Sequence, residues 1–112
     1  MTELEKFFTK LDDNLDAEKA SNINATFCFK IGGDDGGTWV ADLTKSRGPW
    51  VTKVDGDIES DCIFITKNAK DWIKIGTGKM NGMVAMVRGK LKFEGDDKVG
   101  MKIMAFFPKK LD

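Results

Sequence analysis

The segment from residue 73 to residue 103 constrains the fold most, because glycine and methionine are concentrated in it. Five of the six methionines of the chain lie here: Met80, Met83, Met86, Met101 and Met104. Glycines at positions 76, 78, 82, 89, 95 and 100 punctuate the segment, and glycine marks element ends and close backbone approaches. Methionine adapts to irregular apolar shapes. The pattern predicts short elements, in the order helix, helix, strand and helix, around a cavity for variable apolar guests.

Apolar periodicity predicts the remaining elements. Alternating patterns predict strands at 25–31, 38–43, 50–54, 62–66 and 89–94. Helices are expected from a Thr2–Glu5 capping box to Leu15, over 68–75, over 82–87 behind the cap Asn81, and from Asp96 or Asp97 to Pro108. The predicted fold class is α+β, with one five-stranded sheet covered by helices on one face and residues 1–112 in a single domain.

Two of these elements leave a question open. The strand at 62–66 is apolar on both faces because of Ile63 and Ile65, so it is either covered on both sides or leaves an apolar patch. The N-terminal helix is amphipathic and is expected to cover the sheet or the cavity. A transient contact of this helix with a membrane surface is the alternative, although its charges are mixed rather than basic.

Composition argues against several classes of function. Lysine and arginine number 18, as do aspartate and glutamate, so the basic excess that nucleic-acid binding needs is absent. The chain has no histidine, which leaves Cys28 and Cys62 without the partner of a catalytic thiol or a metal motif. The acids at 55–61 lack the glycine and glutamate of a calcium loop. We therefore predict no catalytic residues, no metal, no cofactor and no enzyme activity.

Several ordered motifs carry a resemblance to a known family. They are Phe27–Ile31, Trp39–Leu43, Asp61-Cys62, Gly78-Lys79-Met80-Asn81, Ala85-Met86, Gly89-Lys90-Leu91-Lys92-Phe93 and Val99–Ile103. In order and rough spacing, from about residue 25 to 104, they resemble the sterol carrier protein type-2 family. The family pattern has Asn-Pro-Gln where this chain has Asn81-Gly82-Met83, and Phe where it has Met86. These departures make the expected site more apolar and more adaptable.

The resemblance implies a mixed sheet with an apolar tunnel between sheet and helices. It also implies non-covalent binding of fatty acids, acyl-CoA or sterols and their intracellular transfer. Eleven residues are predicted to line the lipid site: Phe29, Leu43, Phe64, Trp72, Ile75, Met80, Met83, Met86, Val87, Met101 and Met104.

Two alternatives and the compartment stay open at this point. The chain is alternatively an interaction module that uses the Ile63/Ile65 face or the last helix, or an accessory domain of a lipid-metabolising enzyme without a ligand of its own. Family members often end in a Ser-Lys-Leu type signal, which implies peroxisomal import machinery as a partner. This chain ends in Lys109-Lys110-Leu111-Asp112. The cytosol is therefore the default prediction, beside the peroxisome.

Overall fold

The computed structural model describes residues 1–112 and contains one five-stranded sheet in the order β3-β2-β1-β4-β5. The strands are β1 (Thr26–Ile31), β2 (Gly37–Asp42), β3 (Val51–Val54), β4 (Cys62–Thr66) and β5 (Leu91–Gly95). The central β1 pairs in parallel with β4, while the other neighbouring pairs are antiparallel. The sheet is therefore mixed, and the predicted α+β class is confirmed.

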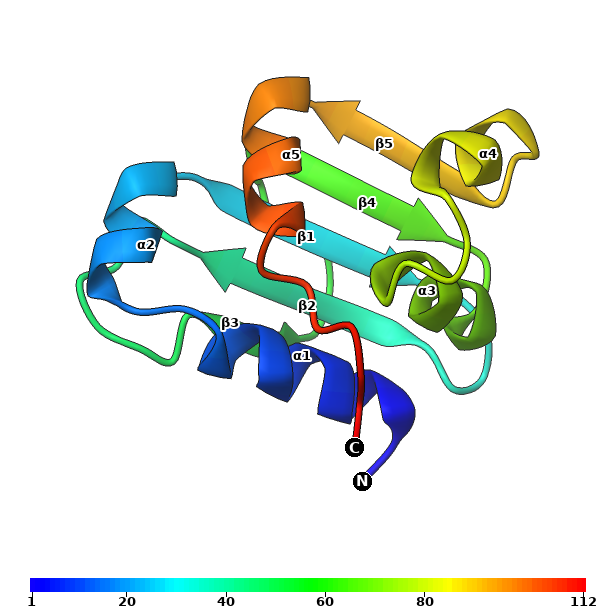
Figure 1. Ribbon diagram of the computed structural model, residues 1–112, viewed down its shortest axis with the longest axis horizontal. Helices are drawn as coiled ribbons and strands as arrows, with labels where there is room; N and C mark the ends of the chain where they lie inside the picture. The colour runs from blue at the N-terminus through cyan, green and yellow to red at the C-terminus, as the bar shows by residue number, and fades with distance from the viewer.

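All helices lie on one face of the sheet (Figure 1). They are α1 (Glu3–Asp13), α2 (Ala17–Ile23), α3 (Ala69–Gly76), α4 (Gly82–Val87) and α5 (Asp97–Met104). The predicted capping box of Thr2 and Glu5 is present, and Asn68, Asn81 and Asp96 cap α3, α4 and α5. The C-terminal tail runs across the helical layer and ends beside the N-terminus (Figure 1). No helix has the length and apolar character needed to span a membrane.

The sequence pattern missed α2 and extended the first helix too far. The helix α1 ends at Asp13, and Leu15 lies in the turn that follows, where it is still buried. Asp16 then caps α2 by accepting a hydrogen bond from the Lys19 backbone N–H at 2.8 Å. The apolar spacing from Leu4 to Leu15 suggested one helix because a buried turn residue continues the same periodicity as a helical one.

The core between sheet and helices is aromatic and closely packed. Phe8 stacks on Trp39 with ring centroids 4.5 Å apart, and Phe29 stacks on Phe64 at 5.1 Å. Trp72 of α3 is fully buried against these rings. Aromatic pairs at such distances add to the stabilisation from buried area, so this cluster contributes to the stability of the fold.

The loop 55–61 crosses the outer face of the sheet on its way from β3 to β4. Asp57 forms an ion pair of 2.8 Å with Lys30, and the Asp61 carboxylate accepts a hydrogen bond of 2.9 Å from the Thr26 backbone N–H. Cys28 lies fully buried on this face. Ile63 and Ile65 are half-buried there, so the predicted apolar patch is only partly exposed.

Candidate functional site

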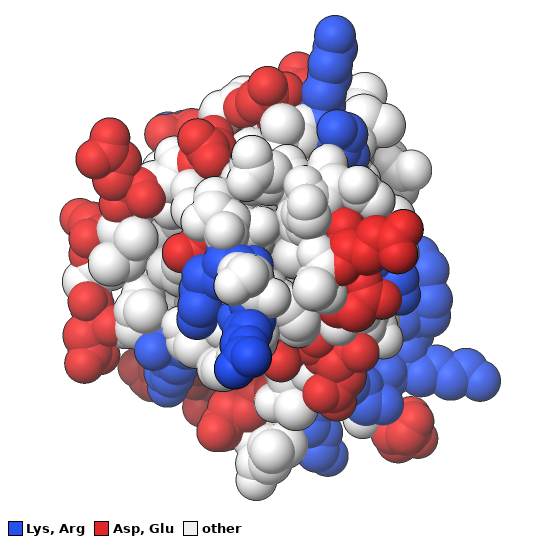
Figure 2. Space-filling model, turned by 90° about the vertical axis from the view of Figure 1, so that its left-hand side faces the viewer, with Lys and Arg blue, Asp and Glu red and all other residues white.

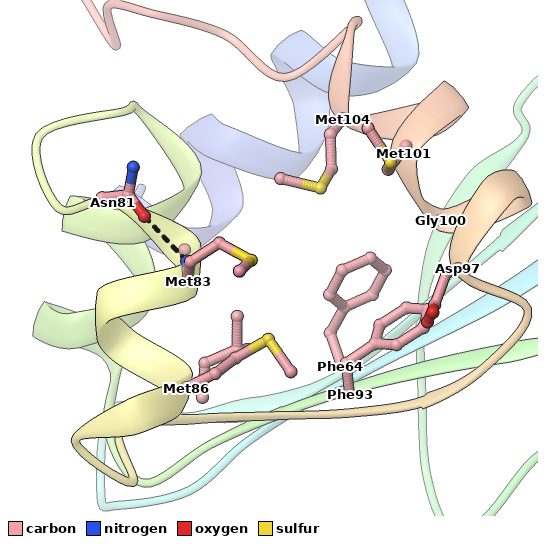
Figure 3. Close-up of a pocket in the computed structure, with 11 residues that line it drawn as sticks. Phe64, Asn81, Met83, Met86, Phe93, Asp97, Gly100, Met101 and Met104 are labelled. Carbon is pink, nitrogen blue, oxygen red and sulfur yellow. Dashed lines mark hydrogen bonds between the residues drawn. The ribbon is translucent and has the colours of Figure 1, made fainter.

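An apolar groove of about 440 Å³ lies between α4 and α5, above the β4–β5 side of the sheet. Its volume falls in the range of small-molecule sites. Phe64 of β4 and Phe93 of β5 form the floor between the two helices (Figure 3). The lining residues are Phe64, Asn81, Gly82, Met83, Met86, Leu91, Phe93, Asp97, Gly100, Met101 and Met104.

The α4 wall is a short helix that is held by few contacts. Asn81 begins it, since its side-chain oxygen accepts hydrogen bonds from the backbone N–H groups of Met83 at 2.8 Å and Val84 at 3.2 Å. Ala85 is its only buried residue. Met83 and Met86 extend from α4 towards the space between the helices (Figure 3). The cap thus fixes the start of the helix, and Ala85 is the one side chain that α4 buries against the rest of the molecule.

The α5 wall presents Asp97, Gly100, Met101 and Met104 to the groove. These positions fall on one face of a helix because they are spaced three and four residues apart. Asp96 caps α5 by accepting from the Lys98 backbone N–H at 2.9 Å. A Cβ on Gly100 would stand 2.7 Å from Cζ of Phe93, so glycine at this position lets the Phe93 ring lie directly against the helix.

The four groove methionines are unusually exposed for apolar side chains. Their exposed fractions are 75% for Met83, 45% for Met86, 71% for Met101 and 38% for Met104. Exposed apolar patches on soluble proteins commonly mark binding surfaces. The apolar space in this structure is thus a groove open to solvent, because α4 stands away from α5 over the sheet edge. The resemblance implies a closed tunnel instead.

The electrostatics of the groove are simple. Asn81 and Asp97 are its only lining residues with a polar side chain, and no lysine or arginine lines it. Asp97 takes part in none of the three ion pairs of the molecule. Near the groove, the Cys62 thiol donates a hydrogen bond of 3.3 Å to the Asp96 carbonyl, and burial raises the pKa of Cys62 and of Cys28. Both thiols are therefore un-ionised at neutral pH, as predicted.

The structure brings five of the eleven predicted lining residues together in the groove: Phe64, Met83, Met86, Met101 and Met104. Four others, Phe29, Leu43, Trp72 and Ile75, are buried in the main core. Met80 packs against that core, and Val87 points to solvent with 88% of its surface exposed.

The lining residues that sequence reasoning missed are Asn81, Gly82, Leu91, Phe93, Asp97 and Gly100. Helical spacing from Met101 and Met104 would have indicated Gly100 and Asp97 on the same face. Alternation along β5 already placed Leu91 and Phe93 inward. The sequence did not reveal that β5 lies directly below α5.

Comparisons with known proteins agree on one family. The chain is 38% identical over 84 residues to sterol carrier protein 2 of Gallus gallus, and the aligned region makes up 72% of this chain and 15% of that protein. It is 30% identical over 100 residues to hydroxysteroid dehydrogenase-like protein 2 of Homo sapiens, and the aligned region makes up 89% of this chain and 23% of that protein. The chain therefore spans less than a quarter of the length of these relatives.

A solved structure gives the same fold. The complex of sterol carrier protein 2 from Aedes aegypti with the C16 fatty acid palmitate superposes with a TM-score of 0.66 at 18% identity, covering 95% of this chain and 94% of that one. The family model of the SCP-2 sterol transfer family matches residues 4–108. Motifs, fold and comparisons thus lead to one conclusion: the chain belongs to the SCP-2 sterol transfer family.

Proposed function

We propose that this chain binds the apolar part of a lipid non-covalently in the methionine-lined groove and carries it between membranes or enzymes. The observation that carries the proposal is the pair of facing helices with four exposed methionines above an aromatic floor. A guest in this groove would cover apolar surface that now contacts water. Methionine side chains can repack around guests of different shape, which suits fatty acids, acyl-CoA and sterols alike.

The expected affinity follows from the area that a guest removes from water. Burying about twelve methylene groups at about 0.8 kcal/mol each gives about 10 kcal/mol before costs. Loss of ligand freedom offsets several kcal/mol, which leaves a dissociation constant of about micromolar. The palmitate complex of the Aedes aegypti relative supports this class of ligand. We further propose that carriage takes place in the cytosol or the peroxisome.

A binding role rather than a catalytic one fits the side chains of the groove. No nucleophile lines it, and the only carboxylate there is that of Asp97. General acid–base work requires a positioned group with a matched pKa, whereas this site consists mainly of thioether and aromatic surface. We therefore propose that the lipid leaves the groove chemically unchanged.

Displacement of a fluorescent fatty-acid probe tests the proposal. The double variant Met101→Asp/Met104→Asp places two carboxylates in the groove wall and should weaken probe binding at least tenfold. Ile58→Asp is the matched control, because Ile58 is an exposed apolar residue on the outer face; it should bind like the wild type. Absence of saturable binding by the wild type to fatty-acid, acyl-CoA and sterol probes would refute the proposal.

A second candidate function is that of an accessory domain in a lipid-metabolising enzyme. The observation that favours it is the length of the relatives, of which this chain spans 23% and 15%. An accessory domain without a ligand of its own should leave all probes free in solution. The same titration therefore separates the two functions.

A further inference from the structure

The segment 72–93 is the longest stretch of the chain in which all charged residues have the same sign. It carries five basic residues and no acid: Lys74, Lys79, Arg88, Lys90 and Lys92. Since the whole chain has a net charge of zero, the remaining residues carry an excess of five acids. The side of the molecule away from α4 shows acidic and basic side chains intermixed (Figure 2). The segment that contains α4 thus differs from that side in carrying basic residues without acids.

The same region turns an apolar helix face to solvent. Val87 and Met83 are 88% and 75% exposed, Met86 and Val84 flank them at 45% and 42%, and Ala85 is buried on the opposite side. This order follows from 3.6 residues per turn, with Val87 and Met83 at the centre of the outward face. Val87 and Met83 are thus mostly uncovered, while Met86 and Val84 are about half covered. We define Met83, Val84, Met86 and Val87 as the α4 face.

Basic residues lie close to both ends of α4 in the chain. Lys79 lies in the turn before α4, Arg88 is the residue that ends it, and Lys90 follows. None of these three is in an ion pair, whereas Lys92 pairs with Glu94 at 3.3 Å. Lys109 adds a further charge, because its Nζ lies 3.9 Å from where a Cβ would stand on Gly78.

The opposite rim of the groove has no such excess. The helix α5 carries Asp97 as well as Lys98 and Lys102, and Asp96 caps it. An approaching negative surface would therefore meet an excess of unpaired cations along the α4 side, and a balance of acidic and basic residues along the α5 side. This difference gives the molecule a preferred orientation towards such a surface.

We propose that the α4 face docks onto an anionic lipid bilayer. Its apolar side chains enter the boundary between headgroups and acyl chains, while Lys79, Arg88 and Lys90 contact lipid phosphates and carboxylates. Interfacial binding of this kind combines buried apolar area with attraction of each cation to anionic lipid. The four apolar residues are few, so the cations are needed for stable contact.

Docking in this orientation has a consequence for the groove. Met83 and Met86 belong both to the α4 face and to the groove lining. The open side of the groove would then meet the bilayer, and a lipid would pass between them with little exposure to water. This consequence rests on the proposed function, whereas docking itself does not.

Co-sedimentation with vesicles tests the docking. Wild-type protein should bind vesicles of phosphatidylcholine with phosphatidylserine more strongly than vesicles of phosphatidylcholine alone, and added salt should weaken the binding. Lys79→Glu/Arg88→Glu should lower the partition coefficient on anionic vesicles by about tenfold or more. Val87→Asp should lower it as well, since it places a carboxylate at the centre of the α4 face.

The matched control is Lys6→Glu/Arg47→Glu, which makes the same change of charge on α1 and in the loop before β3. It should retain most of the vesicle binding. All altered residues are exposed, and unchanged unfolding curves should show that the variants fold. Probe binding in solution should be intact in Lys79→Glu/Arg88→Glu, which separates docking from the groove.

Two results would overturn the proposal. One is failure of the wild type to bind anionic vesicles, which would leave the α4 face to a protein partner. The other is an equal loss of binding in the control and in Lys79→Glu/Arg88→Glu, which would show that net charge rather than this face determines the contact.

Discussion

Met83 is the groove residue at which the chain departs most clearly from its family pattern, which has glutamine there. A thioether accepts hydrogen bonds only weakly and donates none. The side chain is 75% exposed in the groove without a guest and would be covered by one. Residue 83 should therefore influence which part of a lipid is held at this depth.

The substitution Met83→Gln should shift preference towards ligands with a polar group beside α4. Where the ligand offers a partner, the amide gains about 1 kcal/mol; where it does not, covering the amide costs about 1–3 kcal/mol. Affinities of both proteins for a fatty acid, an acyl-CoA and a sterol would measure the shift. Equal changes for all three ligands would mean that residue 83 does not contact the guest.

Asp97 is the single charged residue of the groove and should disfavour anionic ligands. Replacing it by asparagine should tighten palmitate binding by about twofold, a small effect because Asp97 is exposed and screened by solvent. The corresponding long-chain alcohol is the control ligand, since it carries no charge and its affinity should stay the same. A gain for the alcohol as large as that for palmitate would argue against a charge effect.

The residues of the groove were only partly predictable from the sequence. The methionine pattern of 73–103 predicted Met83, Met86, Met101 and Met104 as lining residues, and all four lie along the groove. The prediction rested on the way methionine adapts to irregular apolar shapes. Residue type alone does not distinguish an apolar side chain in the buried core from one that lines a groove. Phe29 and Trp72 were therefore predicted to line the site, and the structure places both in the buried core.

At the scale of elements, Asp12 joins α1 to the start of β3. Its carboxylate oxygen Oδ1 accepts hydrogen bonds from the backbone N–H groups of Trp50 at 2.7 Å and Val51 at 2.9 Å. The sequence predicted both the strand and the helix, although it extended the helix beyond Asp13. It gave no sign of this contact, because the two elements are far apart in the chain.

Asp12→Ala should lower the free energy of unfolding by about 2–3 kcal/mol, since it leaves two partly buried donors without a partner. Asp12→Asn keeps an acceptor oxygen and should lose only about 1 kcal/mol. Urea unfolding of both variants and the wild type gives the comparison. Equal losses would show that the acceptor at this position contributes little.

The predicted elements matched the structure best where a local signal marks them. Capping residues located the starts of α1, α4 and α5, and alternation located the strands. The boundary between α1 and α2 was missed because the buried Leu15 continues the apolar spacing through the turn. The order of the strands came only with the structure, since pairing between distant segments leaves no local pattern.

At the scale of the whole molecule, the buried core and the proposed lipid site occupy different regions. The buried aromatic core lies under α1 and α3, while the groove lies at the β5 side beside α4. Phe64 connects the two regions, since its ring lies 5.1 Å from Phe29 and 4.9 Å from Phe93. Changes at the groove should therefore alter ligand binding more than global stability.

Methyl NMR of the methionines during a lipid titration tests the central claim most directly. The six methyl groups divide into four in the groove and two outside it, Met1 and Met80. On addition of palmitate or its alcohol, the signals of Met83, Met86, Met101 and Met104 should shift and saturate at one lipid per chain, while those of Met1 and Met80 change little. Two results would contradict the assignment of the groove as the lipid site. One is saturable lipid binding without shifts of the four groove signals, and the other is a shift of all six signals in proportion to added lipid.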